Sequence, residues 1–205
     1  TLTEYTEIKR NGDYILSETV YDADGNKTEY TEYLENTSDY NTYSRKKRYE
    51  EYKNGKLAEL REYNEDGRMT KRISYDGEGN KKLYEEYVTL KVKHNGYEGT
   101  TTDTKTREIY NDGKLEHRTE YEYDENGNKT SEYRCKLTQG DGEMPAYVGK
   151  QVETWTYEGD VLVLYEKDTF KSSTGEAVPY LKITYEPVDG DTNQMLAKEY
   201  SYDNI

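Results

Sequence analysis

Cysteine, proline, phenylalanine and tryptophan are all scarce in this sequence. Its 205 residues include one cysteine, three prolines, one phenylalanine and one tryptophan. Because Cys135 is alone, a disulfide framework and a cysteine-rich metal site are excluded. No apolar run approaches the roughly 20 residues that a membrane-spanning helix needs, so we expect no membrane insertion.

Positive charge is also in short supply. Lysine and arginine number 29 against 43 aspartates and glutamates, which gives a formal net charge of −14. An acidic chain repels a phosphate backbone, so we expect no nucleic-acid partner. The one basic run, Arg45–Arg48, is followed at once by Tyr49 and two glutamates. That pattern indicates a solvated strand or loop rather than a binding patch.

Hydrophobic residues make up only 31% of the chain and charged residues 35%, a balance that is typical of disordered proteins. Disordered chains, however, lack aromatic and β-branched residues, whereas this chain has 25 tyrosines and many threonines in a spaced pattern. Tyrosine suits a thin sheet, because its ring covers neighbouring side chains while its hydroxyl stays in water. We therefore expect a folded chain with little aliphatic core.

One motif recurs along the chain and predicts its architecture. Tyr123–Thr130 reads Tyr-Asp-Glu-Asn-Gly-Asn-Lys-Thr, and Tyr21–Thr28, Tyr63–Thr70 and Tyr75–Lys82 are versions of it. Each is a polar cluster around a glycine, flanked by residues that favour strands. Aspartate and asparagine bond their own backbone and glycine takes a positive φ, so each copy predicts a hairpin turn. The similar Asp22–Asn26 sequence has its glycine fourth rather than sixth, which favours a turn over a calcium loop.

Regular spacing supports a repeat of hairpins. Tyr63, Tyr75 and Tyr87 lie twelve residues apart, and Tyr52–Tyr63 matches Tyr110–Tyr121. Turn signals recur at intervals that fit one strand and one turn. We predict an all-β fold, an antiparallel meander of repeated β-hairpins in an elongated or coiled single sheet that forms one domain over residues 1–205.

The C-terminal part, residues 152–202, is more apolar than the rest of the chain. In residues 161–170 both faces of the predicted strand carry apolar side chains, which predicts that this strand is covered on both sides. The most conventional core is therefore expected near residues 152–185, at Val152, Trp155, Leu162, Leu164, Tyr180, Leu181 and Ile183.

No catalytic signature is present. His94 and His117 are the only histidines, and no local motif joins them to Cys135 as base and nucleophile. There is no phosphate-binding glycine-rich loop and no metal-ligand motif. We expect no enzyme, no cofactor and no metal.

Three segments interrupt the regular spacing of strands and turns and are candidates for binding loops or for linkers between hairpins: residues 35–42, 96–105 and 138–149.

The motif Tyr-Asp-x-x-Gly-Asn-x-Thr, in Tyr21–Thr28 and Tyr123–Thr130, resembles the YD repeats of Rhs-type and teneurin-type proteins. The resemblance covers about half of the chain. It implies hairpins that coil into a long antiparallel sheet, often a hollow shell, on secreted or surface-attached proteins. The chain lacks the arginine-rich motif that commonly closes such a shell, so a flat or coiled fragment of sheet is the expectation here.

Two functions follow as expectations. The first is a non-enzymatic extracellular or cell-surface module that acts as a spacer, shell segment or adhesive surface, with another surface protein as a partner. The second is a carbohydrate- or cell-wall-binding module, because aromatic rings on a flat face can stack on sugar rings. Tyrosine stripes can equally be cross-strand ladders that hold the sheet together. The candidate ligand-binding residues are Tyr121, Tyr123, Trp155 and Tyr157.

Overall fold

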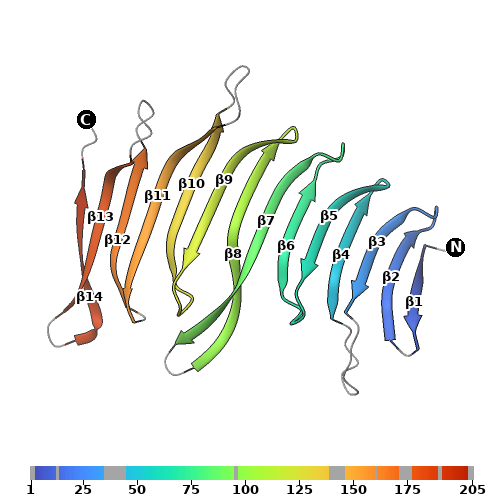
Figure 1. The fold of residues 1–205 in the computed structure, drawn as a ribbon, viewed down its shortest axis with the longest axis horizontal. Coiled ribbons are helices and arrows are strands. Elements are labelled where there is room, and N and C mark those ends of the chain that lie inside the picture. The colour runs from blue at the N-terminus through green and yellow to red at the C-terminus, as the bar shows by residue number, and fades with distance from the viewer. Residues whose placement is uncertain are drawn as a thin grey trace. The chain divides into compact units, whose positions relative to one another are not determined.

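Fourteen β-strands and no helix make up the part of the chain that the computed structural model describes, which is residues 3–12, 14–34, 45–94, 97–138, 146–159, 161–170, 177–188 and 191–202 (Figure 1). The strands are β1 (Glu4–Asn11), β2 (Tyr14–Asp22), β3 (Lys27–Tyr33), β4 (Lys46–Lys53), β5 (Lys56–Tyr63), β6 (Met69–Tyr75), β7 (Lys81–His94), β8 (Tyr97–Asn111), β9 (Lys114–Tyr123), β10 (Lys129–Thr138), β11 (Ala146–Glu158), β12 (Val161–Phe170), β13 (Ala177–Val188) and β14 (Asp191–Ser201).

Each strand is hydrogen-bonded to the strand that follows it in the sequence, so the order in the sheet is the order in the chain. The strands are antiparallel and form one open sheet, which confirms the predicted all-β meander of hairpins. Contacts group the chain into two units, one of residues 1–88 with 109–114 and one of residues 89–108 with 115–205. The prediction of a single domain over residues 1–205 stays a prediction.

Two turn designs recur among the connections that the structure describes. In the shorter design two residues with positive φ join β4 to β5, Asn54 at 52° and Gly55 at 74°. Asp112 at 49° and Gly113 at 72° do the same between β8 and β9. Positive φ at both central residues belongs to the type I′ turn, whose twist matches that of the two strands. These are the asparagine–glycine and aspartate–glycine signals of the sequence.

The longer design is the recurrent motif seen at Tyr21–Thr28, and its polar residues have separate roles. In the copy between β2 and β3, the Asp22 carboxylate accepts hydrogen bonds from the backbone N–H of Asp24, at 3.0 Å, and of Asn26, at 2.8 Å. The Asn26 side chain donates back to Asp22 at 3.0 Å. Gly25 has a φ of 83°, which residues with a side chain rarely adopt. The predicted hairpin turn is therefore confirmed.

The threonine that ends the motif has a structural role too. Next to the turn the register shifts by one residue between Val20 and Tyr21 on β2, and this leaves Thr28 of β3 in a bulge. The Thr28 hydroxyl donates to the Val20 carbonyl at 3.2 Å, and Thr70 donates to the Glu62 carbonyl at the same distance in another copy. The motif thus encodes the turn and the bulge that follows it.

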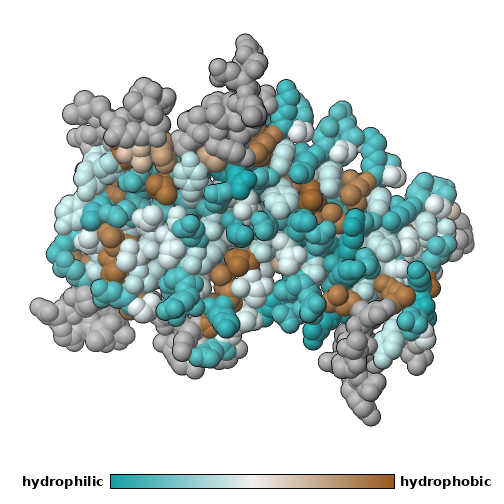
Figure 2. All heavy atoms as spheres, viewed as in Figure 1, coloured by the Kyte–Doolittle hydropathy of each residue, from teal (hydrophilic) through white to brown (hydrophobic). Residues whose placement is uncertain are grey.

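The sheet has almost no apolar core. Among the described residues, the buried hydrophobic side chains are those of Leu60 and Cys135, while four glutamates and two threonines are buried beside them. Figure 2 shows hydrophobic residues scattered among hydrophilic ones on the face in view. The strands form one layer in each unit, so both faces reach water.

The expected core near residues 152–185 is therefore wrong. Tyr180 is 48% exposed, and the side chains of the other six predicted core residues are only half-buried. Strand β12 is not covered on both sides: Val161 is 48% exposed and the rest of the strand is half-buried. The physical reason is that the sheet extends by adding strands side by side, and none of the described residues forms a second layer over these apolar side chains.

Parts of two of the three segments that were expected to be irregular lie in strands. Residues 97–105 belong to the regular strand β8 rather than to a loop. Residues 146–149 lie in β11 and residue 138 ends β10. Residues 35–42, 96 and 139–145 lie outside the described residues, so the prediction for them stays a prediction.

Candidate functional site

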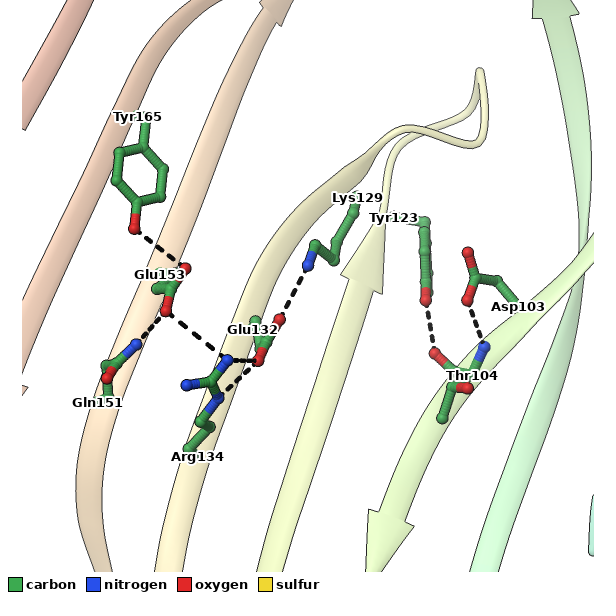
Figure 3. A network of polar contacts seen from close by, with 9 residues as sticks. All are labelled: Asp103, Thr104, Tyr123, Lys129, Glu132, Arg134, Gln151, Glu153 and Tyr165. Carbon is green, nitrogen blue, oxygen red and sulfur yellow. Dashed lines mark hydrogen bonds and ion pairs between the residues drawn. The ribbon is translucent and has the colours of Figure 1, made fainter.

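A network of polar side chains crosses strands β10, β11 and β12 on one face of the second unit (Figure 3). At its centre is the carboxylate of Glu132, a residue that is only 6% exposed. Glu132 lies 2.8 Å from Lys129 Nζ and 2.5 Å from an Arg134 guanidinium nitrogen. Arg134 also reaches the carboxylate of Glu153 on β11, at 3.8 Å. A buried carboxylate is thus matched by two cations of its own strand.

The network continues onto β12. The Tyr165 hydroxyl donates to Glu153 at 3.0 Å, and the Gln151 amide donates to the same carboxylate. Burial raises the pKa of Tyr165 to about 12, and the bond to Glu153 adds to the effect. The carboxyl of Glu132 behaves differently. Burial alone would raise its pKa, but the bonds from Lys129 and Arg134 outweigh burial and lower the pKa.

Aromatic rings gather next to this network. Lys129 Nζ lies 4.2 Å from the centre of the Trp155 ring and 5.7 Å from that of the Tyr121 ring. The Trp155 and Tyr165 rings are tilted against each other with centres 5.5 Å apart. The structure therefore brings together two predicted ligand-binding residues, Tyr121 and Trp155, around a shared lysine.

The other two predicted residues lie elsewhere. The Tyr123 hydroxyl donates to the Thr104 carbonyl of β8 at 2.6 Å, and burial, with the Asp103 carboxylate, raises its pKa. Tyr157 is paired with Leu162 beyond a register shift. Burial raises the pKa of Tyr157, and the Asp124 carboxylate adds to this. A ligand-binding role for any of the four residues stays a prediction.

Lys129 and Tyr165 were missed at the level of sequence. The turn after Glu158 does not by itself place Tyr165, because Trp155 lies opposite Tyr165 only beyond a register shift between Thr156 and Tyr157. The sequence pointed to Lys129 as a site residue only weakly. It occupies the variable position before the last threonine of the motif, and one register shift beside it decides where its side chain points.

The same arrangement recurs in the first unit. The buried Glu50 lies 3.2 Å from Lys27 Nζ and 2.7 Å from an Arg48 guanidinium nitrogen. Lys27 Nζ lies 4.3 Å from the centre of the Tyr52 ring and 4.6 Å from that of Tyr30. A buried glutamate between two cations is thus a repeated device, and in these two copies one cation is a lysine that lies over aromatic rings. This recurrence favours a role in holding strands together.

A third copy of the device lies on β5 and β6. The buried Glu59 accepts a hydrogen bond from Arg72 at 2.9 Å and pairs with Arg61 of its own strand. Arg72 also lies 3.6 Å from the carboxylate of Glu85 on β7. Burial alone would raise the pKa of Glu59, but its bonds to Arg72 and Arg61 lower it. Each network ties two or three neighbouring strands.

An open hollow of about 710 Å³ lies beside the turn between β9 and β10. It is lined by the Lys91–Val92 part of β7, by residues 98–100 of β8 and by Glu125–Asn126 of the turn. Gly127 of this turn sits so close to β7 that an added Cβ would lie 2.7 Å from Val92 Cγ1. The hollow is formed because the turn rests on β7, and its lining combines carboxylate, lysine and backbone groups without a recognisable catalytic set.

Among the described side chains, Cys135 and His117 do not form a catalytic pair. The Cys135 thiol is buried, and burial raises its pKa, which disfavours the reactive thiolate. Its sulfur lies 3.5 Å from the Arg118 carbonyl oxygen. His117 faces Lys136 in the sheet and lies 3.6 Å from the Glu116 carboxylate. The side chain of His94 lies outside the described residues.

The described residues hold neither a metal-binding cluster nor a membrane-spanning helix. No group of three or more histidine, cysteine, aspartate or glutamate side chains is placed to hold a metal ion there. Within the same residues, no helix has the length and hydrophobicity to cross a membrane.

No protein-family model matches the chain, and no curated protein matches its sequence. Among solved structures, the chain is similar to one in the crystal structure of TcdB2-TccC3-Cdc42, at 14% identity and a TM-score of 0.39. The match covers 94% of this chain but only 10% of the other, so this chain spans about a tenth of its length. A porin-like protein from Bacteroides uniformis matches at 14% identity and a TM-score of 0.22, over 87% of this chain and 93% of the other.

Proposed function

We propose that this chain is a non-enzymatic structural module of an extracellular or cell-surface protein, built from hairpin repeats of the YD type. Its role would be that of a spacer, shell segment or adhesive surface. The observation that carries the proposal is the recurrence of one polar device in both units, around Glu50, Glu59 and Glu132, in a sheet that is wet on both faces.

The side-chain contacts support a structural role because each network stabilises the strands around it, as an apolar core does in other folds. The negative charge of a buried glutamate is balanced when it is bonded to two cations, and these bonds link adjacent strands. Such a unit can be repeated without limit, since it depends only on its nearest neighbours. The acidic surface, the lone buried Cys135 and the motif resemblance support an extracellular setting.

A repeat deletion tests the structural role. Tyr63 and Tyr87 hold equivalent places in the repeat, so removing residues 63–86 deletes one whole hairpin and rejoins two strands that run in the same direction. We expect this variant to keep its sheet signal in circular dichroism and to unfold cooperatively. A deletion of residues 63–80 joins the same strands out of phase and should destabilise the fold more. Equal damage from both deletions would contradict a repeat module.

Surface exposure is a separate test of the extracellular setting. Antibodies against the chain should bind intact cells that produce it, and external protease should remove the signal. A signal that appears only after lysis would overturn the extracellular placement and leave the structural role untouched.

A second candidate is glycan binding, which is favoured by the gathering of Tyr121 and Trp155 around Lys129. Lys129 already lies over both rings, a cation–π contact of about 0.5–2 kcal/mol that a sugar ring would have to replace. Trp155 is the only tryptophan, so its fluorescence reports on this site alone. Titration with cell-wall polysaccharides should shift that fluorescence, and Tyr121→Ala should weaken the response. An unchanged spectrum would reject this candidate.

A further inference from the structure

Strands β7 and β8 project past the end of β9 (Figure 1). β9 ends at Tyr123, and the hydroxyl of that residue reaches the Thr104 carbonyl of β8 at 2.6 Å. Because β8 and β9 are antiparallel neighbours, residues 98–100 of β8 lie beyond the end of β9. They lie beside the turn between β9 and β10 instead, and the open hollow of about 710 Å³ is the notch between this turn and the projecting strands.

One wall of the hollow is fixed by a close contact between the turn and β7. An added Cβ on Gly127 would lie 3.0 Å from the Lys91 carbonyl oxygen and 2.7 Å from Val92 Cγ1, so the absence of a side chain lets the turn rest on β7. The equivalent glycines of two other copies of the motif, Gly25 and Gly79, meet nothing within 4 Å. The hollow is therefore specific to this copy, and a wall that is already in place lowers the entropic cost of binding a ligand.

Charged groups of opposite sign line the hollow and do not meet. Lys91 of β7 and Glu125 of the turn are both exposed, and among the described residues neither side chain has an ion pair or a hydrogen bond. Cations and carboxylates that reach each other in this sheet do pair, as Lys71 and Glu62 do at 2.6 Å. The walls of the hollow thus hold one ammonium and one carboxylate apart, and each can bind a partner.

We propose that the hollow binds a short peptide that has both a free amino terminus and a free carboxyl terminus. The carboxylate of the peptide pairs with Lys91, and its ammonium pairs with Glu125. A ligand with one charge leaves the opposite wall unpaired, and a neutral sugar satisfies neither wall. The peptide also presents backbone groups to the Asn126 side-chain amide and the Gly99 backbone, and Val92 offers it an apolar contact.

The volume of the hollow sets the length of this peptide. Small-molecule sites typically measure about 300–1,000 Å³, and the hollow falls within that range. A sphere of 710 Å³ is about 11 Å across, and an extended chain covers about 3.3–3.6 Å per residue, so three residues span it. A tripeptide therefore has the reach to join the two charges. The structural role proposed above does not depend on the hollow, so this inference goes beyond it.

Titration with trialanine, followed in amide NMR spectra of the natural chain, tests the site. The signals of Val92, Gly99 and Asn126 should shift and saturate, because these residues line the hollow. Acetylation of the peptide's amino terminus and amidation of its carboxyl terminus each remove one charge. Because an exposed ion pair contributes modestly, each blocked peptide should bind about twofold to fivefold more weakly than trialanine.

Two variants assign the charges to their walls. Lys91→Gln should bind trialanine as weakly as the natural chain binds the amidated peptide, and amidation should then make no further difference. Glu125→Gln should do the same for acetylation. Both side chains are exposed, so neither change should disturb the fold. The matched controls are Glu65→Gln, at the same place in another copy of the motif, and Lys82→Gln, on β7 outside the hollow, and both should bind like the natural chain.

Four results would overturn the proposal. Three are signals of the hollow that stay unchanged up to high millimolar trialanine, blocked peptides that bind as tightly as the free one, and control variants that weaken binding as much as Lys91→Gln and Glu125→Gln. The fourth is tighter binding of the neutral disaccharide diacetylchitobiose at the same signals, which would make the hollow a sugar site. None of these results bears on the hairpin deletion, which tests the structural role separately.

Discussion

Removal of the charge on Glu132 tests most directly whether buried glutamates bonded to two cations hold this sheet together. Glu132→Gln keeps the size of the side chain but leaves Lys129 and Arg134 without the carboxylate that they share at 2.8 and 2.5 Å. The amide of glutamine can accept fewer hydrogen bonds than a carboxylate and carries no charge. The two cations must then find water or more distant carboxylates.

The stability that Glu132→Gln is expected to lose depends on how deeply the ion-pair partners are buried. Breaking a fully buried ion pair by removing one partner costs about 3–5 kcal/mol. Here the carboxylate side is buried, but the Arg134 and Lys129 side chains are 49% and 36% exposed and can recover hydration. We therefore expect Glu132→Gln to lower the free energy of unfolding by about 1–3 kcal/mol.

Urea unfolding followed by circular dichroism measures this difference. Glu120→Gln is the matched control, because the Glu120 carboxylate lies 2.6 Å from Arg118 on its own strand but its side chain is 47% exposed. That pair should contribute about 0.2–1 kcal/mol. If the two variants lose equal stability, buried carboxylates do not hold the sheet.

The pH dependence of the difference has a definite sign. The folded pKa of Glu132 is lowered, so its contribution is fully present above the unfolded pKa of about 4.3. It is lost as the pH falls through the folded value. The gap between the natural chain and Glu132→Gln should therefore stay constant near neutrality and close in acid.

Three further predictions concern the turns and the tyrosines. Gly127→Ala should destabilise the fold by several kcal/mol in calorimetry, because its Cβ would clash with Val92. Gly25→Ala is the control: it has a similar φ but its Cβ meets open space, so it should cost about 1 kcal/mol. Asp22→Ala should cost about 1–2 kcal/mol in urea unfolding, and Asp22→Asn much less, since Asn64 accepts the same two backbone bonds in its own turn. The stability that Tyr33, Tyr87 and Tyr165 contribute should be full below the unfolded tyrosine pKa of about 10 and be lost as the pH rises to about 12. Tyrosinate absorbance of the natural chain should therefore differ from that of a Tyr33→Phe, Tyr87→Phe, Tyr165→Phe variant only as the pH nears 12, and a difference near pH 10 with the sheet intact would contradict the raised pKa values.

The hairpin turns were predictable from sequence because their chemistry is local. Gly25 and Asp22 act within a few residues of each other, so the motif contains all the information that the turn needs. The antiparallel meander was predictable for the same reason, since short turns join neighbouring strands. The motif threonine was not recognised as the bulge residue, although Thr28 and Thr70 bond the preceding strand in the same way.

The side-chain networks were not predictable, because they depend on register between strands. Sequence reasoning treated Leu162 and Leu164 as core residues since their neighbours are apolar, but burial needs a second layer that this sheet lacks. Glu132 looked like one acidic residue among 43. Only the pairing of β10 with β9 and β11 shows that it is buried and bonded to two cations.

The heat capacity change of unfolding tests the central claim most directly. A globular protein of 205 residues has a ΔCp of about 2.5–3 kcal/mol/K, because unfolding exposes a large apolar core. In this sheet both faces are wet before unfolding, and buried carboxylates exposed on unfolding lower ΔCp further. Calorimetry over a range of pH should give a value below about 2 kcal/mol/K. A value of about 2.5–3 kcal/mol/K would mean that a conventional core stabilises the fold, and would contradict a sheet held together by its turns and charge networks.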